Sequence, residues 1–516
     1  GMLRAKNRKW LLGMGVLIAL CLCGGVGGLT ITGEGYIQRY SGRIYPGVSV
    51  YGVSLGGRTP AEASVMLRSA FSPPEQPLTL RDGERTWHSS WADFALDIDA
   101  AATAQLAYRV GREGNALQQH FTRWRTLFFG QRLSPVVTLP DARRLEVALQ
   151  AFSSQVWIPP RDADLVITSE GVSPLPPQPG QALDLEAMLS YFPYTISSGP
   201  DGIIIEVLTR PVSPTVTDVG VAQAYAEQLL VTSLTLVADD PLTAFRASWI
   251  VTPTEVIPWL TTRIVRPPES TEAHLVVTIR EEPLRVYLKG LASRLSASSD
   301  LVALEIEESL AAVRTTVEAG GFQAPLVFSH PPRTYLVQPG DTLSSIAYAH
   351  GFPVWRLEQV NPGIANTRLR PGQPILIPSL DVLFPFPLIT DRRIVVDLSD
   401  QRLYAYEGDR LVYNFIASTG IPSSPTIPGV FQILSKEEEA YASSWDLWMP
   451  HFMGIYYTAP DFTNGIHALP TLSNGTRLWE GVLGRPVSYG CIVLGIADAA
   501  ALYQWADLGT LVVIRE

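Results

Sequence analysis

The chain has 516 residues, of which 46% are hydrophobic and 17% are charged, so its composition predicts three or four globular domains with ample core. Its net charge of -10 and the lack of a dense basic stripe argue against nucleic acid as a partner. Glycine and proline, at 41 residues each, predict many turns and short strands.

The N-terminal residues indicate a location outside the cytoplasm. Residues 1–9 carry four basic side chains, whereas residues 10–32 are uncharged. As a helix, the second stretch would span about 35 Å, enough to cross a hydrocarbon core of about 30 Å. The basic flank favours an N-in orientation. We therefore expect a single-pass anchor in the cell membrane with the rest of the chain on the extracytoplasmic side. A cleaved signal peptide is the alternative.

The following region predicts two related α+β units. Thr59–Glu62 reads as a helix start, with Thr59 as N-cap and Glu62 closing a capping box. A tryptophan-containing strand that leads into a helix occurs twice, at Trp87–Trp91 and at Ala247–Val251. Residues 44–67 resemble a peptidoglycan-binding domain found ahead of VanW-like and other cell-wall proteins. This resemblance implies that the units bind peptidoglycan.

A small module lies between two proline clusters, Pro331–Pro332 and Phe384–Pro387. Its pattern predicts a strand, two helices and a strand, with Pro339–Leu343 at the first turn, Asn361–Pro362 after the second helix and Pro371–Gln373 before the last strand. This order resembles a LysM domain. The resemblance implies binding to glycans that contain N-acetylglucosamine, so that the module tethers the chain to peptidoglycan. The ligand contacts that it implies are Gly340, Asp341, Thr342, Leu343 and Ile364, of which Asp341 and Thr342 also suit a helix cap.

The C-terminal part predicts a mostly β domain. Ile394–Tyr406 alternates apolar and polar residues and leads into a turn at Glu407–Asp409, which is typical of a hairpin. Cys491 is the only cysteine outside the first 23 residues. A lone cysteine beside glycine, with a histidine within reach, is a candidate nucleophile, although an isolated cysteine is more often a small buried hydrophobe.

The motifs of this domain resemble the L,D-transpeptidase catalytic domain of the YkuD type. They are Ile394–Leu403, Ser418–Gly420, Pro425–Phe431, Gly465–His467 and Ser488–Cys491, in the order of that family. The resemblance implies a cysteine acyltransferase that acts on peptidoglycan stem peptides, with Cys491 as nucleophile, His467 as base and the amides around Tyr489–Cys491 holding the oxyanion. The expected catalytic residues are Cys491, His467, Gly490, Tyr489 and Ser488, and the expected substrate-binding residues of this domain are His451, Trp448, Arg477 and Arg485.

Two residues depart from the family pattern. Tyr489 stands where a histidine is usual and cannot act as a base near neutral pH. Val493 replaces an arginine, for which Arg477 or Arg485 is the candidate substitute. Three activities fit the sequence: an L,D-transpeptidase, an L,D-carboxypeptidase that uses water as acceptor, and a wall-binding protein without catalysis. Retention of Cys491 and His467 favours an enzyme.

The sequence thus predicts a multidomain protein without metal or cofactor, since its histidines are scattered and no Cys-x-x-Cys occurs. The predicted parts are a cytoplasmic basic segment (1–9), a transmembrane helix (10–32), two α+β repeat units (33–155 and 156–330), a βααβ LysM module (333–379) and a mostly-β L,D-transpeptidase-like domain (390–516).

Overall fold

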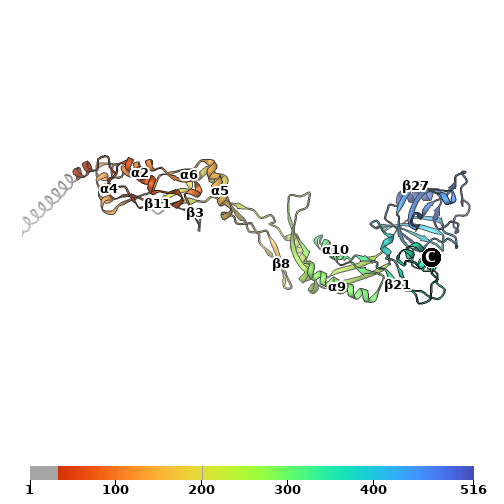
Figure 1. Ribbon diagram of the computed structural model, residues 1–516. Coiled ribbons are helices and arrows are strands. Elements are labelled where there is room, and N and C mark those ends of the chain that lie inside the picture. The colour runs from red at the N-terminus through yellow and green to blue at the C-terminus, as the bar shows by residue number, and fades with distance from the viewer. Residues whose placement is uncertain (1–32, 200–201) are drawn as a thin grey trace, which may run out of the picture. The chain divides into compact units, whose positions relative to one another are not determined.

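The computed structural model describes residues 33–199 and 202–516 (Figure 1). The predicted basic segment and transmembrane helix, residues 1–9 and 10–32, lie outside these described residues. Within the described ranges, no helix is both long and apolar enough to cross a bilayer.

The chain forms two compact units. The first contains the described residues up to Ala163 together with Pro176–Thr217, and the second contains Asp164–Leu175 and Asp218–Glu516. The division expected between residues 155 and 156 therefore differs from the observed one. It falls at the end of helix α5 (Ala142–Val156), inside the first unit.

The first unit combines helices with short strands. Thr59 caps α2 as predicted, because its side chain accepts the Glu62 N–H at 3.2 Å while the Glu62 carboxylate accepts the Thr59 N–H at 2.8 Å. The elements are β1 (Val48–Val50), β2 (Val53–Ser54), α2 (Pro60–Ala70), η1 (Pro73–Glu75), β3 (Pro77–Asp82), β4 (Arg85–Ser90), η2 (Ala92–Phe94), β5 (Asp97–Ile98), α3 (Ala100–Arg109), α4 (Ala116–Phe129), β6 (Gln131–Leu133), β7 (Val137–Thr138), α5, β10 (Gly180–Leu183), α6 (Leu185–Thr195), β11 (Ile196–Gly199), β12 (Gly202–Glu206) and β13 (Thr209–Val212).

The second unit begins with another α+β part, followed by two further modules. The elements of the α+β part are β8 (Asp164–Thr168), β9 (Gly171–Leu175), α7 (Gly220–Leu229), β14 (Leu234–Asp240), β15 (Phe245–Val251), α8 (Pro253–Val256), η3 (Ile257–Trp259), β16 (Leu260–Val265), β17 (His274–Ile279), α9 (Glu281–Ser298), β18 (Ala303–Leu304), α10 (Ile306–Glu318), β19 (Gln323–Pro325) and β20 (Phe328–Ser329).

The two α+β parts contain the same strand arrangement. In the first, β12 pairs in parallel with β3 of the hairpin β3–β4, and in the second, β19 pairs in parallel with β14 of the hairpin β14–β15. The repeated tryptophans occupy equivalent places: Trp87 is the cross-strand partner of Leu80, and Trp249 is the partner of Leu236. Both leucines are fully buried. In each hairpin, the tryptophan and its buried leucine partner therefore form a cross-strand pair on the face that points toward the core.

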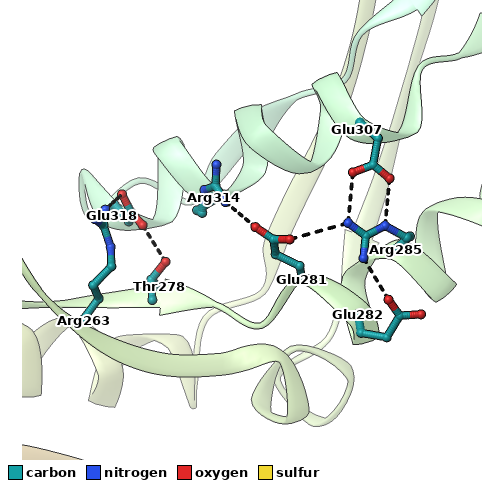
Figure 2. A network of polar contacts seen from close by, with 8 residues as sticks. All are labelled: Arg263, Thr278, Glu281, Glu282, Arg285, Glu307, Arg314 and Glu318. Atoms are coloured by element: carbon teal, nitrogen blue, oxygen red, sulfur yellow. Dashed lines mark hydrogen bonds and ion pairs between the residues drawn. The ribbon is translucent and has the colours of Figure 1, made fainter.

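A network of charged side chains ties α9 and α10 to the hairpin β16–β17 (Figure 2). Arg285 donates to both carboxylate oxygens of Glu307, at 2.7 and 2.9 Å, which links the two helices. Glu318 accepts from Arg263 and from Thr278, each at 2.6 Å, which links α10 to the hairpin. The network comprises Arg263, Thr278, Glu281, Glu282, Arg285, Glu307, Arg314 and Glu318.

The next module has the predicted βααβ order. Its elements are β21 (Arg333–Leu336), α11 (Leu343–Ala349), α12 (Val354–Val360), η4 (Ile364–Asn366) and β22 (Pro374–Ile377), and β21 pairs antiparallel with β22. Thr342 caps α11 in a capping box with Ser345. Asp341 instead fixes the preceding turn, because its carboxylate accepts from the Tyr335 hydroxyl at 2.8 Å and from the Gln338 N–H at 2.7 Å.

The C-terminal domain is mostly β, as predicted. Its strands form one ten-stranded sheet with the order β26-β32-β23-β24-β25-β31-β29-β28-β27 and with β30 on β28. The elements are η5 (Leu380–Leu383), β23 (Ile389–Asp397), β24 (Arg402–Glu407), β25 (Arg410–Ser418), β26 (Gly429–Gln432), β27 (Ser435–Ala442), η6 (Ser443–Trp445), β28 (Leu447–Ala459), β29 (Phe462–Ala468), β30 (Thr471–Leu472), β31 (Ile492–Leu494), α13 (Ile496–Trp505) and β32 (Thr510–Arg515).

The βααβ module and the C-terminal domain share one core. Phe352 of the module and Tyr456 of the domain belong to the same continuous cluster of buried side chains. Trp355 in α12 donates its indole N–H to the carbonyl of Tyr457 in β28, at 2.7 Å. The module is therefore packed on the domain rather than joined to it only through the proline-rich segments.

Deletion of residues 333–379 is expected to destabilise the C-terminal domain as well as remove the module. Because large apolar side chains would lose their partners, the free energy of unfolding should fall by about 3 kcal/mol or more. Thermal and urea unfolding of the remaining chain would measure this. Trp355→Phe, which removes one hydrogen bond and leaves a smaller aromatic side chain, should cost only about 1 kcal/mol. Unchanged unfolding of the deletion variant would instead identify the module as an independent tether.

His330 is buried where the α+β part meets these two modules. Its Nε2 lies 3.0 Å from a carboxylate oxygen of Asp240, at the end of β14, and its Nδ1 lies 2.6 Å from Asp381 in η5. Burial acts to lower the pKa of His330, but the hydrogen bonds and charges of the two carboxylates outweigh it and raise the pKa. Burial likewise acts to raise the pKa of Asp240, and hydrogen bonds from His330 and Thr243 outweigh it and lower the pKa. The imidazolium therefore joins two segments 141 residues apart in the sequence.

The interaction of His330 with Asp240 predicts that the free energy of unfolding depends on pH. A raised histidine pKa stabilises the fold fully below the unfolded value of about 6.5 and loses its effect as pH rises through the folded value. A lowered aspartate pKa stabilises the fold above about 3.9. The stability lost in His330→Gln should thus be largest between about pH 4 and 6.5 and should shrink at higher pH. Urea unfolding of both proteins at several pH values tests this, and a loss that grows with pH would contradict it.

Candidate active site

Cys491 and His467 are brought together by two parallel strands. Cys491 directly precedes β31, and His467 lies in β29, with Ile466 opposite Ile492 and His467 opposite Val493. Because side chains alternate along a strand, Cys491 and His467 lie on the same face of the sheet. Both line a narrow pocket of about 40 Å³. The predicted nucleophile and the predicted base therefore share one site.

The hydrogen bonding of His467 defines its tautomer. Its Nδ1 lies 2.6 Å from the carbonyl oxygen of Ala468, which can only accept, so Nδ1 carries the proton and Nε2 has a free lone pair. The ring is buried, and burial lowers the pKa of His467 to about 4, although the Ala468 carbonyl acts in the opposite direction. His467 is therefore neutral near pH 7 and able to take up a proton at Nε2.

Cys491 rests as a thiol. The residue is half-buried, and its Sγ donates weakly to the side-chain oxygen of Asn464 at 3.7 Å. Burial raises the pKa of Cys491 to about 11, with the Gly465 backbone N–H acting in the opposite direction. A neutral thiol and a neutral imidazole are not a preformed ion pair, so the thiolate can form only by transfer of the proton from sulfur.

The backbone of Gly490 positions the nucleophile. Its φ of 115° is rarely adopted by residues with a side chain, and a Cβ there would lie 2.4 Å from the side-chain nitrogen of Asn464. The Gly490 carbonyl accepts from the hydroxyls of Thr426 at 2.9 Å and Tyr456 at 3.4 Å. Because the peptide bond is planar and trans, the N–H of Cys491 points away from these buried hydroxyls. This N–H is a candidate oxyanion donor.

Ser488 and Tyr489 have different places in the same loop. Ser488 is buried, donates to the carbonyl of Cys491 at 2.6 Å and accepts the Gly490 N–H at 3.2 Å, so it holds the loop together. Tyr489 is exposed, lines the pocket and stacks on Trp445 with ring centroids 6.0 Å apart. Tyr489 is therefore placed to touch a substrate at the rim.

Three buried residues of the site were not identified from the sequence. Asn464 donates to the Tyr456 hydroxyl at 3.2 Å, and Tyr456 and Thr426 hold the Gly490 carbonyl. Burial raises the pKa of Tyr456 to about 12, so its hydroxyl stays neutral and can donate. The available signal was Asn464 itself, a polar residue three positions before His467 and next to Gly465 in the same strand.

The structure places His451 outside the pocket and Val493 in the core. His451 does not line the pocket. Its ring faces Tyr503 of α13 at 5.4 Å, and its Nδ1 lies 3.8 Å from the Glu438 carboxylate. Val493 is fully buried opposite His467. A guanidinium at this position would therefore need a different local packing.

The other three predicted contacts also lie away from the pocket lining. Arg477 pairs with Glu480 at 3.3 Å, and Arg485 is exposed to solvent. Trp448 donates its indole N–H to the Ser473 hydroxyl at 3.1 Å. Neither arginine is positioned beside Cys491 in place of the missing guanidinium.

The predicted glycan contacts of the βααβ module divide into exposed and buried residues. Gly340 and Thr342 are exposed at the turn before α11. Leu343 packs partly against the core, and Ile364 is buried in it. In residues 33–199 and 202–516, no group of three or more His, Cys, Asp or Glu side chains is arranged to hold a metal ion.

Three segments match known domain families. Residues 391–514 match the L,D-transpeptidase catalytic domain (YkuD), residues 335–378 match the LysM domain, and residues 87–203 match a peptidoglycan-binding domain. The last match lies beyond residues 44–67, where the sequence interpretation had placed the resemblance.

The chain is also similar to proteins that are named L,D-transpeptidases. The chain is 30% identical over 180 residues to the L,D-transpeptidase YkuD of Bacillus licheniformis, which is 35% of this chain and 97% of that protein. It is 27% identical over 182 residues to YkuD of Bacillus subtilis, again 35% of this chain and 98% of the relative. A mutant Enterococcus faecium L,D-transpeptidase of known structure is 15% identical over 57% of this chain and 98% of its own, with a TM-score of 0.28.

Replacement of Gly490 by alanine is expected to slow acylation of Cys491 by about tenfold or more, because a Cβ would push the loop away from Asn464. Reaction with p-nitrophenyl acetate, read as acetyl-enzyme by intact mass, measures this rate. Gly475→Ala is the matched control, since Gly475 also has a positive φ, of 85°, but nothing within 4 Å of an added Cβ. Equal losses in both variants would show that general backbone strain, not the contact with Asn464, sets the rate.

Proposed function

Because the chain belongs to the L,D-transpeptidase family, with the YkuD catalytic domain at residues 391–514, we propose that it cross-links peptidoglycan through a thioester on Cys491. The observation that carries this proposal is the pocket in which Cys491 lies with His467, whose Nε2 is free to accept a proton. The substrate is the stem peptide, at the bond between the L-centre of a diamino acid and D-Ala.

The first half-reaction transfers the acyl group to sulfur. As Sγ of Cys491 attacks the peptide carbonyl, its proton passes to Nε2 of His467. The carbonyl oxygen becomes an oxyanion, for which the Cys491 N–H is the nearest backbone candidate. When the tetrahedral intermediate collapses, the C–N bond breaks, and the amine of D-Ala leaves with the proton from His467. The product is the thioester.

The second half-reaction returns the enzyme to its resting state. An acceptor amine loses a proton to His467 and attacks the thioester carbonyl, and the C–S bond breaks as the new peptide bond forms. The departing sulfur regains the proton. The raised pKa of Cys491 favours this return to the thiol. The neutral resting state of His467 suits both steps, since it must accept a proton in each.

Peptidoglycan is also the ligand of the remaining domains. The LysM domain and the peptidoglycan-binding domain at residues 87–203 support binding to the same polymer that the catalytic domain modifies. In this proposal, the LysM domain contacts N-acetylglucosamine-containing glycan through the turn at Gly340–Leu343 and through Ile364. The chain is held at the cell membrane by residues 10–32, with the catalytic domain on the cell-wall side.

The proposal is tested by incubating the chain from residue 33 onward with a disaccharide-tetrapeptide and analysing the products by mass spectrometry. We expect a cross-linked dimer that has lost one D-Ala, and a decrease of at least about 1,000-fold in Cys491→Ala. His451→Gln is the matched control, because His451 lies outside the pocket, and it should retain the wild-type rate within about twofold.

Other outcomes would assign a different activity. Loss of D-Ala without a dimer would identify water as the acceptor and the protein as an L,D-carboxypeptidase. No change with folded protein and an active reference enzyme would favour a wall-binding protein without catalysis. Full activity of Cys491→Ala would overturn the thioester mechanism.

A further inference from the structure

Helix α4 of the first unit presents its apolar side chains to solvent. Leu117, Phe121, Trp124 and Phe128 are 82%, 71%, 53% and 64% exposed. At 3.6 residues per turn, these four positions fall within about 60° of one another on the helix surface. They form one stripe, which we call the α4 stripe. Exposed apolar stripes of this size mark interaction surfaces in soluble domains.

The inward face of α4 is polar, and its polar groups are satisfied. Arg123 is buried and donates to the Gly111 carbonyl and to the Gln119 side chain, each at 2.8 Å. Thr126 is fully buried and donates to the Thr122 carbonyl at 2.7 Å. Turning the helix over would break these hydrogen bonds and leave the buried Gly111 carbonyl without its donor, which is costly. The outward orientation of the stripe is therefore fixed by the fold.

The surroundings of the α4 stripe are basic. Residues 105–139 contain five arginines and one glutamate, in a chain whose net charge is -10. Arg125 and Arg132 are exposed within this segment. Two identical copies meeting at this face would bring like charges together, whereas an anionic surface would be attracted. Aromatic side chains flanked by arginine are typical of helices that lie in the interface of a bilayer.

The stripe also lies near the start of the described chain. Gly33 lies beside the imidazole of His120 in α4, with an added Cβ 3.6 Å from that ring. Tyr36 stacks on Tyr45 with ring centroids 5.4 Å apart, which fastens this start to the first unit. In the sequence, the uncharged residues 10–32 directly precede Gly33. A chain that leaves the bilayer at this point would bring α4 to the membrane surface.

We propose that the α4 stripe docks on the surface of an anionic lipid bilayer, with Phe121, Trp124 and Phe128 in the acyl–headgroup boundary and the neighbouring arginines against lipid phosphates. The contact holds the first unit against the membrane independently of any anchor. It is separate from peptide cross-linking, whose site lies in the other unit.

The test uses the chain from residue 33 onward, whose first unit builds its buried clusters from residues 44–207 and so retains its core without residues 1–32. Binding is measured by co-sedimentation with vesicles of phosphatidylglycerol and phosphatidylcholine and with vesicles of phosphatidylcholine alone. We expect binding to the anionic vesicles and at least about tenfold weaker partitioning for the triple variant Phe121→Ser, Trp124→Ser, Phe128→Ser. The double variant Tyr191→Ser, Tyr194→Ser is the control, since both tyrosines are exposed on α6 of the same unit.

Three results would overturn the proposal: no binding of the wild type to anionic vesicles, equal binding of the triple variant, or equal loss in the tyrosine control. Dimers that form in the wild type and disappear in the triple variant would assign the stripe to a second copy instead. Circular dichroism checks that the triple variant is folded. Turnover of a soluble stem peptide should not change in this variant, so a failed membrane test leaves the proposed cross-linking activity intact.

Discussion

The chemistry of this chain depends on the parallel pairing of β29 with β31. Ile466 and Ile492 are both fully buried and lie opposite each other, so hydrophobic burial fixes the register of the two strands. The same register fixes the positions of the side chains on the other face of the two strands, including His467. A shift by one residue would turn His467 to the opposite face of the sheet and separate it from Cys491. The candidate nucleophile and base are thus held by a contact between two apolar side chains.

Burial in this sheet favours the uncharged forms of both Cys491 and His467. The strands lie in the middle of a wide sheet, and burial opposes a charge on either group. One specific hydrogen bond, from His467 to the Ala468 carbonyl, decides which ring nitrogen is free. A resting neutral pair protects the thiol, because the thiolate is the reactive form toward oxidants and electrophiles. Reactivity is then confined to the moment when a carbonyl carbon lies in front of the sulfur.

Local patterns in the sequence predicted the features of the fold that depend on residues close together in the chain. The capping box at Thr59, the helix cap at Thr342 and the βααβ order follow from residues a few positions apart, and motif resemblance pointed to Cys491 and His467. Contacts between distant residues were not accessible in this way. Thr426 and Tyr456 reach the Gly490 carbonyl from 64 and 34 residues away. His451 was expected to line the approach to the nucleophile as the second histidine of this domain, but the direction in which a strand residue points is set by the pairing of its strand.

Helix α4 shows that an apolar pattern in the sequence does not reveal which face of a helix is buried. Apolar residues at Leu117, Phe121, Trp124 and Phe128 have the spacing of a core-facing helix, and a periodic pattern does not reveal which face points inward. The polar residues decide the question, since Arg123 finds its partners only within the fold. An outward stripe exposes apolar area to water at a free-energy cost, which a lipid surface would remove. Because residues 87–203 of this region match a peptidoglycan-binding domain, docking of α4 on a membrane would bring that domain to the membrane surface.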